Sequence, residues 1–215
     1  MRVTKKIKQT ILSRLEEVYQ GSGTALNYSS AFEALIAVIL SAQCTDKRVN
    51  IVTARLFPIC NTPEQVLALG QEKLEDAIKD CGLFRSKAKN IVAASDLICR
   101  QYNGSVPQTF DELIKLPGVG RKTANVLLSQ LFATPAIAVD THVFRVSNRL
   151  ALATGDTPLQ VEQGLMQIIE RAKWPDAHHW LIWHGRRVCR AQSPLCSTCV
   201  VNDLCRWRTL GEKLF

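Results

Sequence analysis

The sequence is poor in the patterns that form β-structure. Segments in which apolar and polar residues alternate, as in a half-buried strand, are nearly absent, and the apolar segment 136–139 is short. Most of the chain instead repeats apolar residues every three or four positions, which is typical of helices packed on a core. The expected helices span approximately residues 5–20, 30–40, 47–57, 63–70, 71–81, 86–102, 109–116, 121–132, 141–150, 158–169 and 176–189. This pattern predicts an all-α fold.

Long hydrophobic runs are also missing. The longest apolar stretch, Ala34 to Leu40, is much shorter than the roughly 20 residues that cross a bilayer. Charges interrupt the apolar residues at the N-terminal end, which indicates an amphipathic helix rather than a signal peptide. We therefore expect no membrane partner and a cytoplasmic location. No linker rich in proline or glycine divides the chain, so two domains, if present, would pack closely.

Acidic residues are outnumbered by basic ones. Against 19 Asp and Glu the chain has 27 Lys and Arg, which gives a formal net charge of +8. An excess of this size points first to nucleic acid as a polyanionic partner. Charge alone fits a mildly basic protein without such a partner equally well. The apolar fraction of 47% is sufficient for a sizeable core, and 215 residues allow one large or two small domains.

The cysteines are not distributed as in a secreted disulfide protein. Four are scattered, at Cys44, Cys60, Cys81 and Cys99, and four lie close together near the C-terminus, at Cys189, Cys196, Cys199 and Cys205. Four thiolates at such spacing indicate a metal site, with structural zinc and an iron–sulfur cluster as the alternatives. Zinc sites usually combine two short C-x2-C pairs, whereas this segment has one, and the spacing leaves both alternatives open. Nearby arginines, Arg190 among them, would give the site a basic surface.

The most informative stretch is 116–126, LPGVGRKTANV. Gly118 and Gly120 predict a tight turn, and the apolar positions that follow predict a helix. Backbone N–H groups at the start of a helix bind anions, so this turn suits a phosphate. Arg121 and Lys122 would stand at the positive end of the helix dipole, where cations are unfavourable. Such a departure from helix preferences often marks a functional site. The pattern resembles a helix-hairpin-helix motif, with a plain helical corner as the alternative.

Lys122 and Asp140 are the candidate catalytic pair. A lysine of ordinary pKa, about 10.4, is almost fully protonated at neutral pH, so a neutral amine nucleophile requires about 3 kcal/mol of help. The helix dipole supplies at most about 2 kcal/mol, and we therefore expect Lys122 to be partly desolvated. Asp140 stands at an expected helix N-cap, from which it could accept a proton or stabilise positive charge on a sugar. The alternatives are a phosphate contact for Lys122 and a cap alone for Asp140.

Two loops carry weaker signals. SAQCTDKR, residues 41–48, ends an apolar helix with polar residues that could line a pocket. GLFRSKAKN, residues 82–90, leads into a basic helix and contains Leu83, an apolar residue that could enter DNA. On pattern alone, ordinary loops and helix caps explain both segments better. The histidines of 178–187 lack partners at metal-ligand spacing and are interpreted as structural.

Together, LPGVGRKTAN, VDTH (139–142) and the C-x6-C-x2-C-x5-C spacing resemble endonuclease III, a family of bacterial DNA glycosylase/AP lyases in the helix-hairpin-helix–GPD superfamily. The resemblance extends from about Lys6 to Trp207. It implies two helical domains that flank a DNA-binding cleft. One is a six-helix barrel with the helix-hairpin-helix motif at residues 23–135, and the other is an iron–sulfur domain formed by 1–22 and 136–215. It also implies a [4Fe-4S] cluster rather than zinc.

The resemblance also implies roles for individual residues. The catalytic lysine and aspartate correspond to Lys122 and Asp140, and the cluster ligands to Cys189, Cys196, Cys199 and Cys205. Positions that contact DNA correspond to Gln43, Leu83, Gly118, Gly120, Arg121 and Arg190. Among these, Gln43 fills the gap left by an extruded base and Leu83 is a wedge on the opposite side. Ser41 and Asp46 correspond to positions in the base pocket.

The implied reaction acts on a nucleotide flipped out of double-stranded DNA. Lys122 attacks the sugar C1′ while the base leaves, Asp140 assists, and β-elimination from the Schiff base cuts the strand 3′ to the lesion. The implied substrates are oxidised or ring-saturated pyrimidines and abasic sites. We expect a monomer that works on the nucleoid in the bacterial cytoplasm.

One unusual feature and two rival functions bear on this expectation. Cys44 and Cys81 stand beside the DNA-probing positions, where the family need not have cysteine, and they suggest sensitivity to oxidation. The family's adenine-excising branch is a rival, although it usually lacks the lysine that corresponds to Lys122. A non-catalytic iron–sulfur module that binds DNA is a second rival, in which Lys122 and Asp140 would have no necessary place.

Overall fold

A computed structural model describes residues 3–210. Within this range the chain forms twelve α-helices and three short 3-10 helices and no strand, so the all-α prediction is confirmed. None of the described helices is long and apolar enough to cross a membrane. The chain divides into two compact units. The central unit comprises residues 25–133, and the terminal unit combines the segment that ends at Thr24 with the segment that starts at Thr134.

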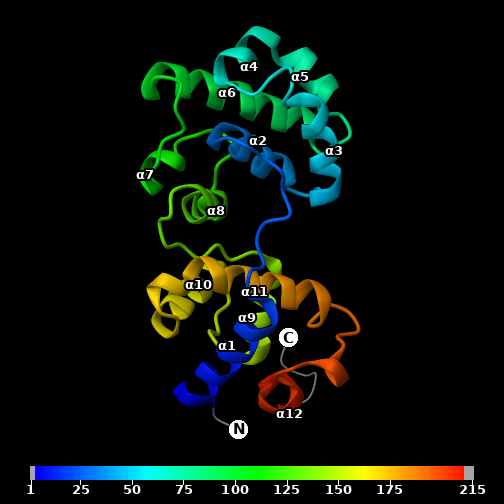
Figure 1. Cartoon of the computed structure of the whole chain (residues 1–215), viewed down its shortest axis with the longest axis vertical. Coiled ribbons are helices and arrows are strands. Elements are labelled where there is room, and N and C mark those ends of the chain that lie inside the picture. Colours follow the sequence, from blue (N-terminus) through cyan, green and yellow to red (C-terminus); the bar gives the residue numbers. More distant parts are fainter. Residues whose placement is uncertain (1–2, 211–215) are drawn as a thin grey trace. The chain divides into compact units, whose positions relative to one another are not determined.

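The central unit is built around one apolar helix (Figure 1). Its helices are α2 (Ala31–Ser41), α3 (Asp46–Leu56), α4 (Pro63–Leu69), α5 (Gln71–Ala77), α6 (Phe84–Tyr102), α7 (Phe110–Leu113) and α8 (Arg121–Leu131). Every residue of α2 from Phe32 to Leu40 is buried, and α2 packs against α3, α6 and α8. A helix that is apolar on all sides belongs in the centre of a domain. The central position of α2 thus fixes the loop that follows it at the edge of the core.

Local signals determine where several helices begin. The Thr62 side chain accepts a hydrogen bond from the backbone N–H of Gln65, and the Gln65 side chain accepts one from the Thr62 N–H. Pro63 occupies the first turn of α4. Thr157 forms the same capping box at the start of α10. These caps satisfy N–H groups that a helix leaves unpaired at its start, and they confirm the starts predicted at both threonines.

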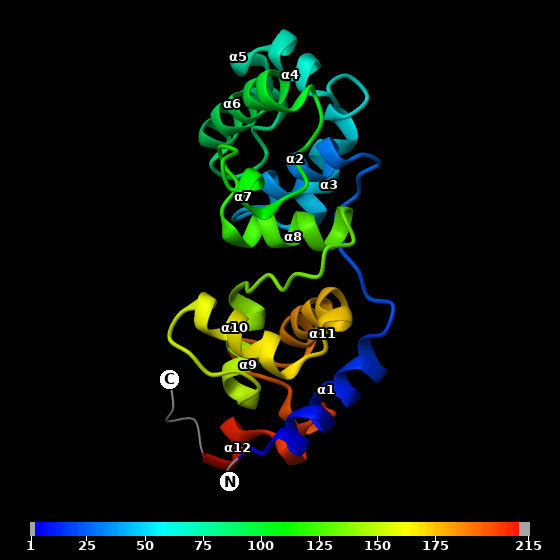
Figure 2. The ribbon, with the colours of Figure 1, turned by 90° about the vertical axis from the view of Figure 1, so that its left-hand side faces the viewer.

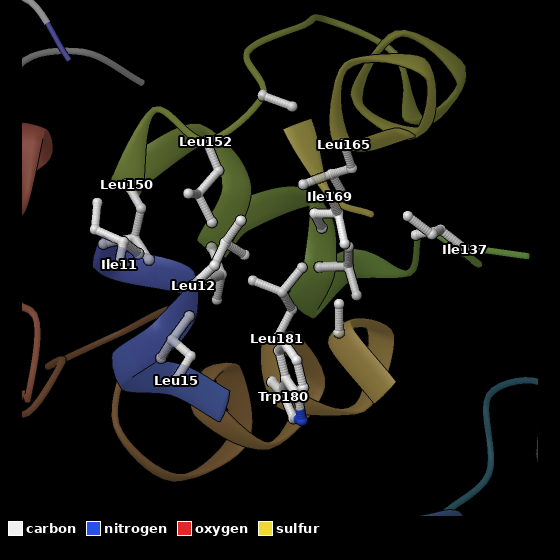
Figure 3. Packing of buried hydrophobic residues seen from close by; sticks show 14 of the residues in the cluster. Ile11, Leu12, Leu15, Ile137, Leu150, Leu152, Leu165, Ile169, Trp180 and Leu181 are labelled. Atoms are coloured by element: carbon white, nitrogen blue, oxygen red, sulfur yellow. The ribbon is translucent and has the colours of Figure 1, made fainter. Parts of the chain in front are cut away.

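The terminal unit contains the remaining helices (Figure 2). They are α1 (Lys5–Tyr19), α9 (Thr141–Leu150), α10 (Pro158–Ile168), η1 (Arg171–Lys173), α11 (Trp174–Arg187), η2 (Cys196–Thr198), η3 (Asn202–Leu204) and α12 (Arg206–Leu210). Helix α11 packs against both α1 and α9. Their apolar faces meet in one core, where Leu15, Leu150, Leu165 and Leu181 are each at most 1% exposed (Figure 3).

Helix α1 is fixed to the last part of the chain by polar contacts as well. Arg14 donates to the carbonyl oxygen of Val200 at 3.0 Å and to Oδ1 of Asp203 at 2.6 Å. Lys8 donates to the carbonyl oxygen of Leu152 at 2.7 Å. Lys173 forms an ion pair with Glu16 at 2.8 Å. The terminal unit is therefore discontinuous because its first helix completes a core made by its last ones.

Several predicted helix bounds are wrong. Helix α5 ends at Ala77 rather than at Cys81, because Ile78 leaves helical geometry and the Cys81 N–H bonds back to the Ile78 carbonyl in a turn. The helix predicted over 109–116 is regular only over Phe110–Leu113. Helix α11 starts at Trp174 rather than at Asp176, because Pro175 is accommodated in its first turn. The short helices η1, η2, η3 and α12 are not evident in the sequence.

Candidate active site and cysteine cluster

The hairpin between α7 and α8 depends on one glycine for its backbone shape. Gly118 has φ +83°, in the left-handed region that other residues rarely adopt. A Cβ atom at this position would also lie 3.0 Å from the Cβ of Asn90 on α6. The Val119 N–H bonds to the Leu116 carbonyl at 3.0 Å and closes the turn. The hairpin therefore packs closely on α6 at Gly118, where an added side chain would crowd Asn90 and strain the backbone.

Gly120 contributes in a different way, as the N-cap of α8. Its φ of −90° strains no residue, and a Cβ there would meet no atom within 4 Å. No side chain caps α8, although six other α-helices of the described chain have a side-chain cap at their start, namely α1, α2, α3, α4, α9 and α10. The first N–H groups of α8 therefore border open space at the positive end of the helix, the arrangement that binds anions.

The two predicted cations are in the first turn of α8. The Arg121 guanidinium lies over the Phe110 ring of α7, 5.0 Å from its centroid, so this side chain links the two helices of the hairpin. Lys122 is exposed. The expectation that Lys122 is partly desolvated is thus wrong for the free protein, because the open side of the hairpin that admits an anion also admits water. Desolvation would have to come from a bound partner.

Asp140 is the N-cap of α9. Its Oδ1 accepts a hydrogen bond from the Val143 N–H at 2.7 Å, as its position predicted. The carboxyl is half-buried, and it lies near His142, whose pKa is lowered by burial and raised in part by Asp140. Lys122 belongs to the central unit and Asp140 to the terminal unit.

Two strained loops lie together in the central unit. Gln43, after α2, has φ 52°, and Leu83, before α6, has φ 58°. A non-glycine residue in this region costs about 1–2 kcal/mol, and such strain tends to persist at functional sites. The loops adjoin, since a Cβ on Gly82 would lie 3.4 Å from the Gln43 carbonyl oxygen. Leu83 is also 57% exposed, so the loops present an apolar side chain and an exposed amide side by side.

The predicted pocket residues flank the Gln43 loop. Ser41 is the last residue of α2, and its hydroxyl donates to the Val38 carbonyl of the same helix at 2.8 Å. Asp46 is the first residue of α3, directly after the N-cap Thr45. Both side chains are half-buried. The short connection between two helices therefore holds both residues beside Gln43.

Lys87 is a polar residue of this region that the sequence pattern does not single out. It lies on α6, is 4% exposed, and donates its amine to the Leu40 carbonyl at 2.8 Å. Burial lowers its pKa, and the thiols of Cys81 and Cys44 counteract that effect. Because Leu40 is near the C-terminal end of α2, the cation meets the negative end of that helix. Lys87 thereby joins the first turn of α6, which follows the Leu83 loop, to the end of α2, which precedes the Gln43 loop.

The four C-terminal cysteines line one cavity of the terminal unit, as their spacing predicted. Cys196, Cys199 and Cys205 reach this cavity from the segment that contains the 3-10 turns η2 and η3, and Cys189 reaches it from just after α11. Within residues 3–210, no three His, Cys, Asp or Glu side chains are placed to hold a single metal ion. Four cysteines that line one cavity are a donor set that a metal group of thiolate ligands would fit.

The electrostatics of the cavity also favour a metal group. Burial raises the pKa of Cys199 to about 11, and burial raises that of Cys205. The other thiols of the group add to both shifts, so four thiolates cannot coexist there without positive charge. His184, whose pKa burial lowers to about 4, is neutral and lies 3.7 Å from the Cys199 sulfur through Nε2. Its Nδ1 is 3.3 Å from the Tyr19 hydroxyl of α1.

Arg149 is a second residue that the sequence pattern did not identify. It lies on α9, stacks on Trp207 at 4.4 Å, and places Nη1 3.6 Å from the Cys189 sulfur. The same guanidinium donates to the Arg190 carbonyl at 2.7 Å and to the Ala191 carbonyl at 3.1 Å. The predicted DNA-binding residue Arg190 is exposed. Arg149 therefore fixes the backbone of the loop that presents Arg190.

Two family models match the chain. Residues 36–171 match the HhH-GPD superfamily of base excision DNA repair proteins, and residues 189–205 match the iron–sulfur binding domain of endonuclease III.

Curated relatives and solved structures give the same result. Endonuclease III of Rickettsia conorii is 51% identical, over 91% of this chain and 95% of its own length. Endonuclease III of Escherichia coli K12 is 50% identical, over 92% and 94%. A structure of a trapped endonuclease III–DNA covalent intermediate superimposes with a TM-score of 0.92 at 48% identity, over 95% of this chain and 97% of that one.

Proposed function

The chain belongs to the HhH-GPD superfamily of base excision DNA repair proteins, and on that premise we propose that it is a bifunctional enzyme. As a DNA glycosylase of the endonuclease III type it binds DNA and carries a [4Fe-4S] cluster. The proposal adds that it removes oxidised or ring-saturated pyrimidines and then cleaves the strand 3′ to the abasic site. The central unit serves as the barrel domain and the terminal unit as the iron–sulfur domain. The enzyme acts as a monomer on the nucleoid in the cytoplasm.

DNA is held first through its phosphates. The N–H groups at Gly120 and the start of α8 donate hydrogen bonds to one backbone phosphate, because this helix start lacks a side-chain cap and borders open space. Gly118 allows the turn that presents them. Arg121, stacked on Phe110, adds positive charge beside the same phosphate. Contacts of this kind position the duplex without reading its sequence.

The strained loops open the duplex. Leu83 enters the stack as an apolar wedge, and Gln43 fills the space that the extruded nucleotide leaves. The support for these roles is the positive φ of both residues, the exposure of Leu83, and the contact between the two loops. Ser41 and Asp46, on either side of Gln43, supply polar groups for the extruded base.

Lys122 performs the covalent chemistry. Its neutral amine attacks the sugar C1′, the bond from C1′ to the base breaks, and the base leaves with the bonding electrons. The nitrogen then loses a proton, the C1′–O4′ bond breaks, and the opened sugar carries an iminium at C1′. The iminium acidifies the C2′ hydrogen, and loss of that proton expels the 3′ phosphate by β-elimination. Because Lys122 is exposed in the free chain, the bound DNA must supply the desolvation that favours the amine. The helix start contributes in the same direction.

Asp140 assists at the sugar through the oxygen that does not cap its helix. Oδ1 is occupied by the Val143 N–H. Oδ2 is the oxygen that we assign to the lysine proton and to the positive charge that develops on the sugar. The cap holds the carboxylate in one orientation, so the structural role and the catalytic role are compatible.

The thiolates of Cys189, Cys196, Cys199 and Cys205 would hold the cluster, whose irons supply the positive charge that four buried thiolates require. The reaction needs no redox step from it. With a thiolate at Cys199, neutral His184 donates from Nε2 and accepts from the Tyr19 hydroxyl at Nδ1. Arg149 joins Cys189 to the backbone at Arg190, which thereby becomes a rigid basic contact for phosphate.

The observation that carries the lyase proposal is Lys122 itself, at the open and uncapped start of α8. Borohydride reduction of the protein with abasic-site DNA should trap a covalent complex, and Lys122→Ala should abolish it. Lys73→Ala is the matched control, since Lys73 is an exposed lysine on α5 of the same unit. Absence of a trapped complex from the unmodified protein would refute the lyase activity. The same result with retained DNA binding and no release of any base would favour the non-catalytic iron–sulfur module.

The adenine-excising alternative makes a different prediction. An enzyme of that kind would release adenine opposite a damaged base without forming a borohydride-sensitive adduct. A panel of duplexes with single lesions therefore separates the two activities. Release of oxidised pyrimidines together with an adduct supports the bifunctional enzyme, and release of adenine without one refutes it.

A further inference from the structure

Cys44 and Cys81 are brought together from the two strained loops of the central unit. Cys44 directly follows Gln43, and Cys81 precedes Leu83 by two residues. Their thiols are close enough to interact, since Cys44 raises the pKa of Cys81. The backbones adjoin as well, since a Cβ on Gly82 would lie 3.4 Å from the Gln43 carbonyl oxygen. Both are free cysteines.

The two cysteines differ in their accessibility to solvent. Cys44 is half-buried and can be reached by a small solute, whereas Cys81 is 0% exposed. Cys44 is therefore the sulfur that peroxide can reach first. The buried amine of Lys87 interacts with both thiols while it holds the Leu40 carbonyl at 2.8 Å. Burial and Cys44 raise the pKa of Cys81 to about 11, which makes Cys81 the less reactive thiol of the pair.

We propose that Cys44 and Cys81 form a reversible disulfide in response to hydrogen peroxide, and that this bond switches off the two DNA-probing loops. The Cys44 sulfur attacks one peroxide oxygen, the O–O bond breaks, and the departing hydroxide takes the Cys44 proton and leaves as water, which produces a sulfenic acid. The Cys81 sulfur then attacks the Cys44 sulfur, the S–O bond breaks, and water leaves with the Cys81 proton. Two thiols lose two electrons, and one peroxide is reduced to two waters.

The effect on DNA follows from where the bond would lie, and it rests on the proposed roles of Gln43 and Leu83. Each loop carries one probing residue at a strained φ, and both must adjust as a nucleotide leaves the stack. A disulfide joins the loops one residue from Gln43 and two from Leu83. It requires the two Cα atoms to lie about 4.4–6.8 Å apart, so it fixes the separation of the loops. We expect the oxidised enzyme to excise damaged bases at least 10-fold more slowly.

The chemical part of the proposal can be tested without any substrate. The cluster-loaded protein is treated with one equivalent of hydrogen peroxide, free thiols are alkylated, and tryptic peptides are analysed by mass spectrometry. Trypsin places Cys44 in peptide 15–47, Cys81 in 80–85, Cys60 in 56–73 and Cys99 in 90–100, so each pairing is distinguishable. The expected product is 15–47 joined to 80–85 and cleaved by dithiothreitol. Alkylation of both cysteines after treatment would overturn the proposal.

The functional part compares wild type with Cys44→Ser and Cys81→Ala before and after peroxide. Excision by wild type should fall at least 10-fold and recover with dithiothreitol, while neither variant should change. Cys99→Ser, which alters a different thiol of the same unit, should respond as wild type does. Thermal unfolding of each reduced variant confirms that it is folded, and if Cys81→Ala is not, Cys44→Ser carries the test.

Three other results have distinct meanings. An equal loss of activity in Cys44→Ser would locate the damage elsewhere, such as the cluster, and would overturn the switch. A complete disulfide with unchanged excision would also overturn it. Reduced wild type that excises no damaged base, but still forms the disulfide, would refute the proposed function and leave the cysteine chemistry intact.

Discussion

Helices α8 and α9 begin in opposite ways. Helix α9 has the carboxylate of Asp140 as N-cap, bonded to the Val143 N–H at 2.7 Å. Helix α8 has Gly120, no side-chain cap, and two cations in its first turn. The start of α9 follows the rules of helix stability, and the start of α8 departs from them. The difference supports the proposal that the start of α8 is open for a phosphate and that Asp140 combines a cap with a role in the reaction.

The largest effect expected from this comparison is at Lys122. Lys122→Gln should lower strand cleavage by about three orders of magnitude or more, since the nucleophile is lost. The free energy of unfolding should rise by about 0.3–1 kcal/mol, because a cation leaves the positive end of a helix. Single-turnover cleavage assays and urea unfolding measure the two quantities. A variant that loses stability would show that Lys122 is structural.

Two substitutions distinguish the capping role of Asp140 from its proposed catalytic role. Asp140→Asn keeps an N-cap of similar quality, so stability should change little, while cleavage should fall by about 10²–10⁴-fold. Asp140→Ala should lose similar activity and about 1 kcal/mol of stability in addition. Full activity in Asp140→Asn would mean that the residue acts only as a cap.

The two hairpin glycines should respond differently to substitution. Gly120→Ser would give α8 the cap that it lacks, so stability should rise by a few tenths of a kcal/mol. Because the serine hydroxyl would occupy N–H groups needed by phosphate, DNA affinity should fall about 10-fold. Gly118→Ala should instead cost about 1–2 kcal/mol of stability through its positive φ. Fluorescence anisotropy and thermal unfolding test both, and unchanged affinity in Gly120→Ser would place the phosphate elsewhere.

The smallest effect concerns pH and His142, near the start of α9. Burial lowers the His142 pKa in the folded protein, and Arg145 faces its Nδ1 at 3.1 Å, so the folded state disfavours the protonated ring. The unfolded chain then binds more protons below about pH 6.5, and stability should fall as the pH drops through that value. His142→Gln should reduce the loss between pH 7 and pH 5 in unfolding experiments. An unchanged pH profile in this variant would assign the dependence to other groups.

Features set by neighbouring residues were predictable from the sequence. The caps at Thr62, Thr157 and Asp140 were predicted correctly because each depends on a few adjacent positions. The cysteine spacing likewise predicted a common site, and the motifs together indicated the family that the comparisons show.

Features set by distant contacts were not predictable. Lys87 and Arg149 are placed by partners on other helices, Leu40 and Arg190. The left-handed backbone of Gln43 and Leu83 has no local signal, because neither residue type favours it. Lys122 was expected to be desolvated, whereas an exposed position is the result of the open turn before it.

The contact between Arg14 and Asp203 also has a consequence for synthesis. The two residues are separated by 189 positions, so α1 leaves the ribosome long before the segment on which it packs. At about 5–20 residues per second the delay is roughly 10–40 s. The central unit, encoded between the two halves, has time to fold while α1 still has an uncovered apolar face. Closure of the terminal unit therefore waits for the segment around Asp203, which also contains Cys199 and Cys205.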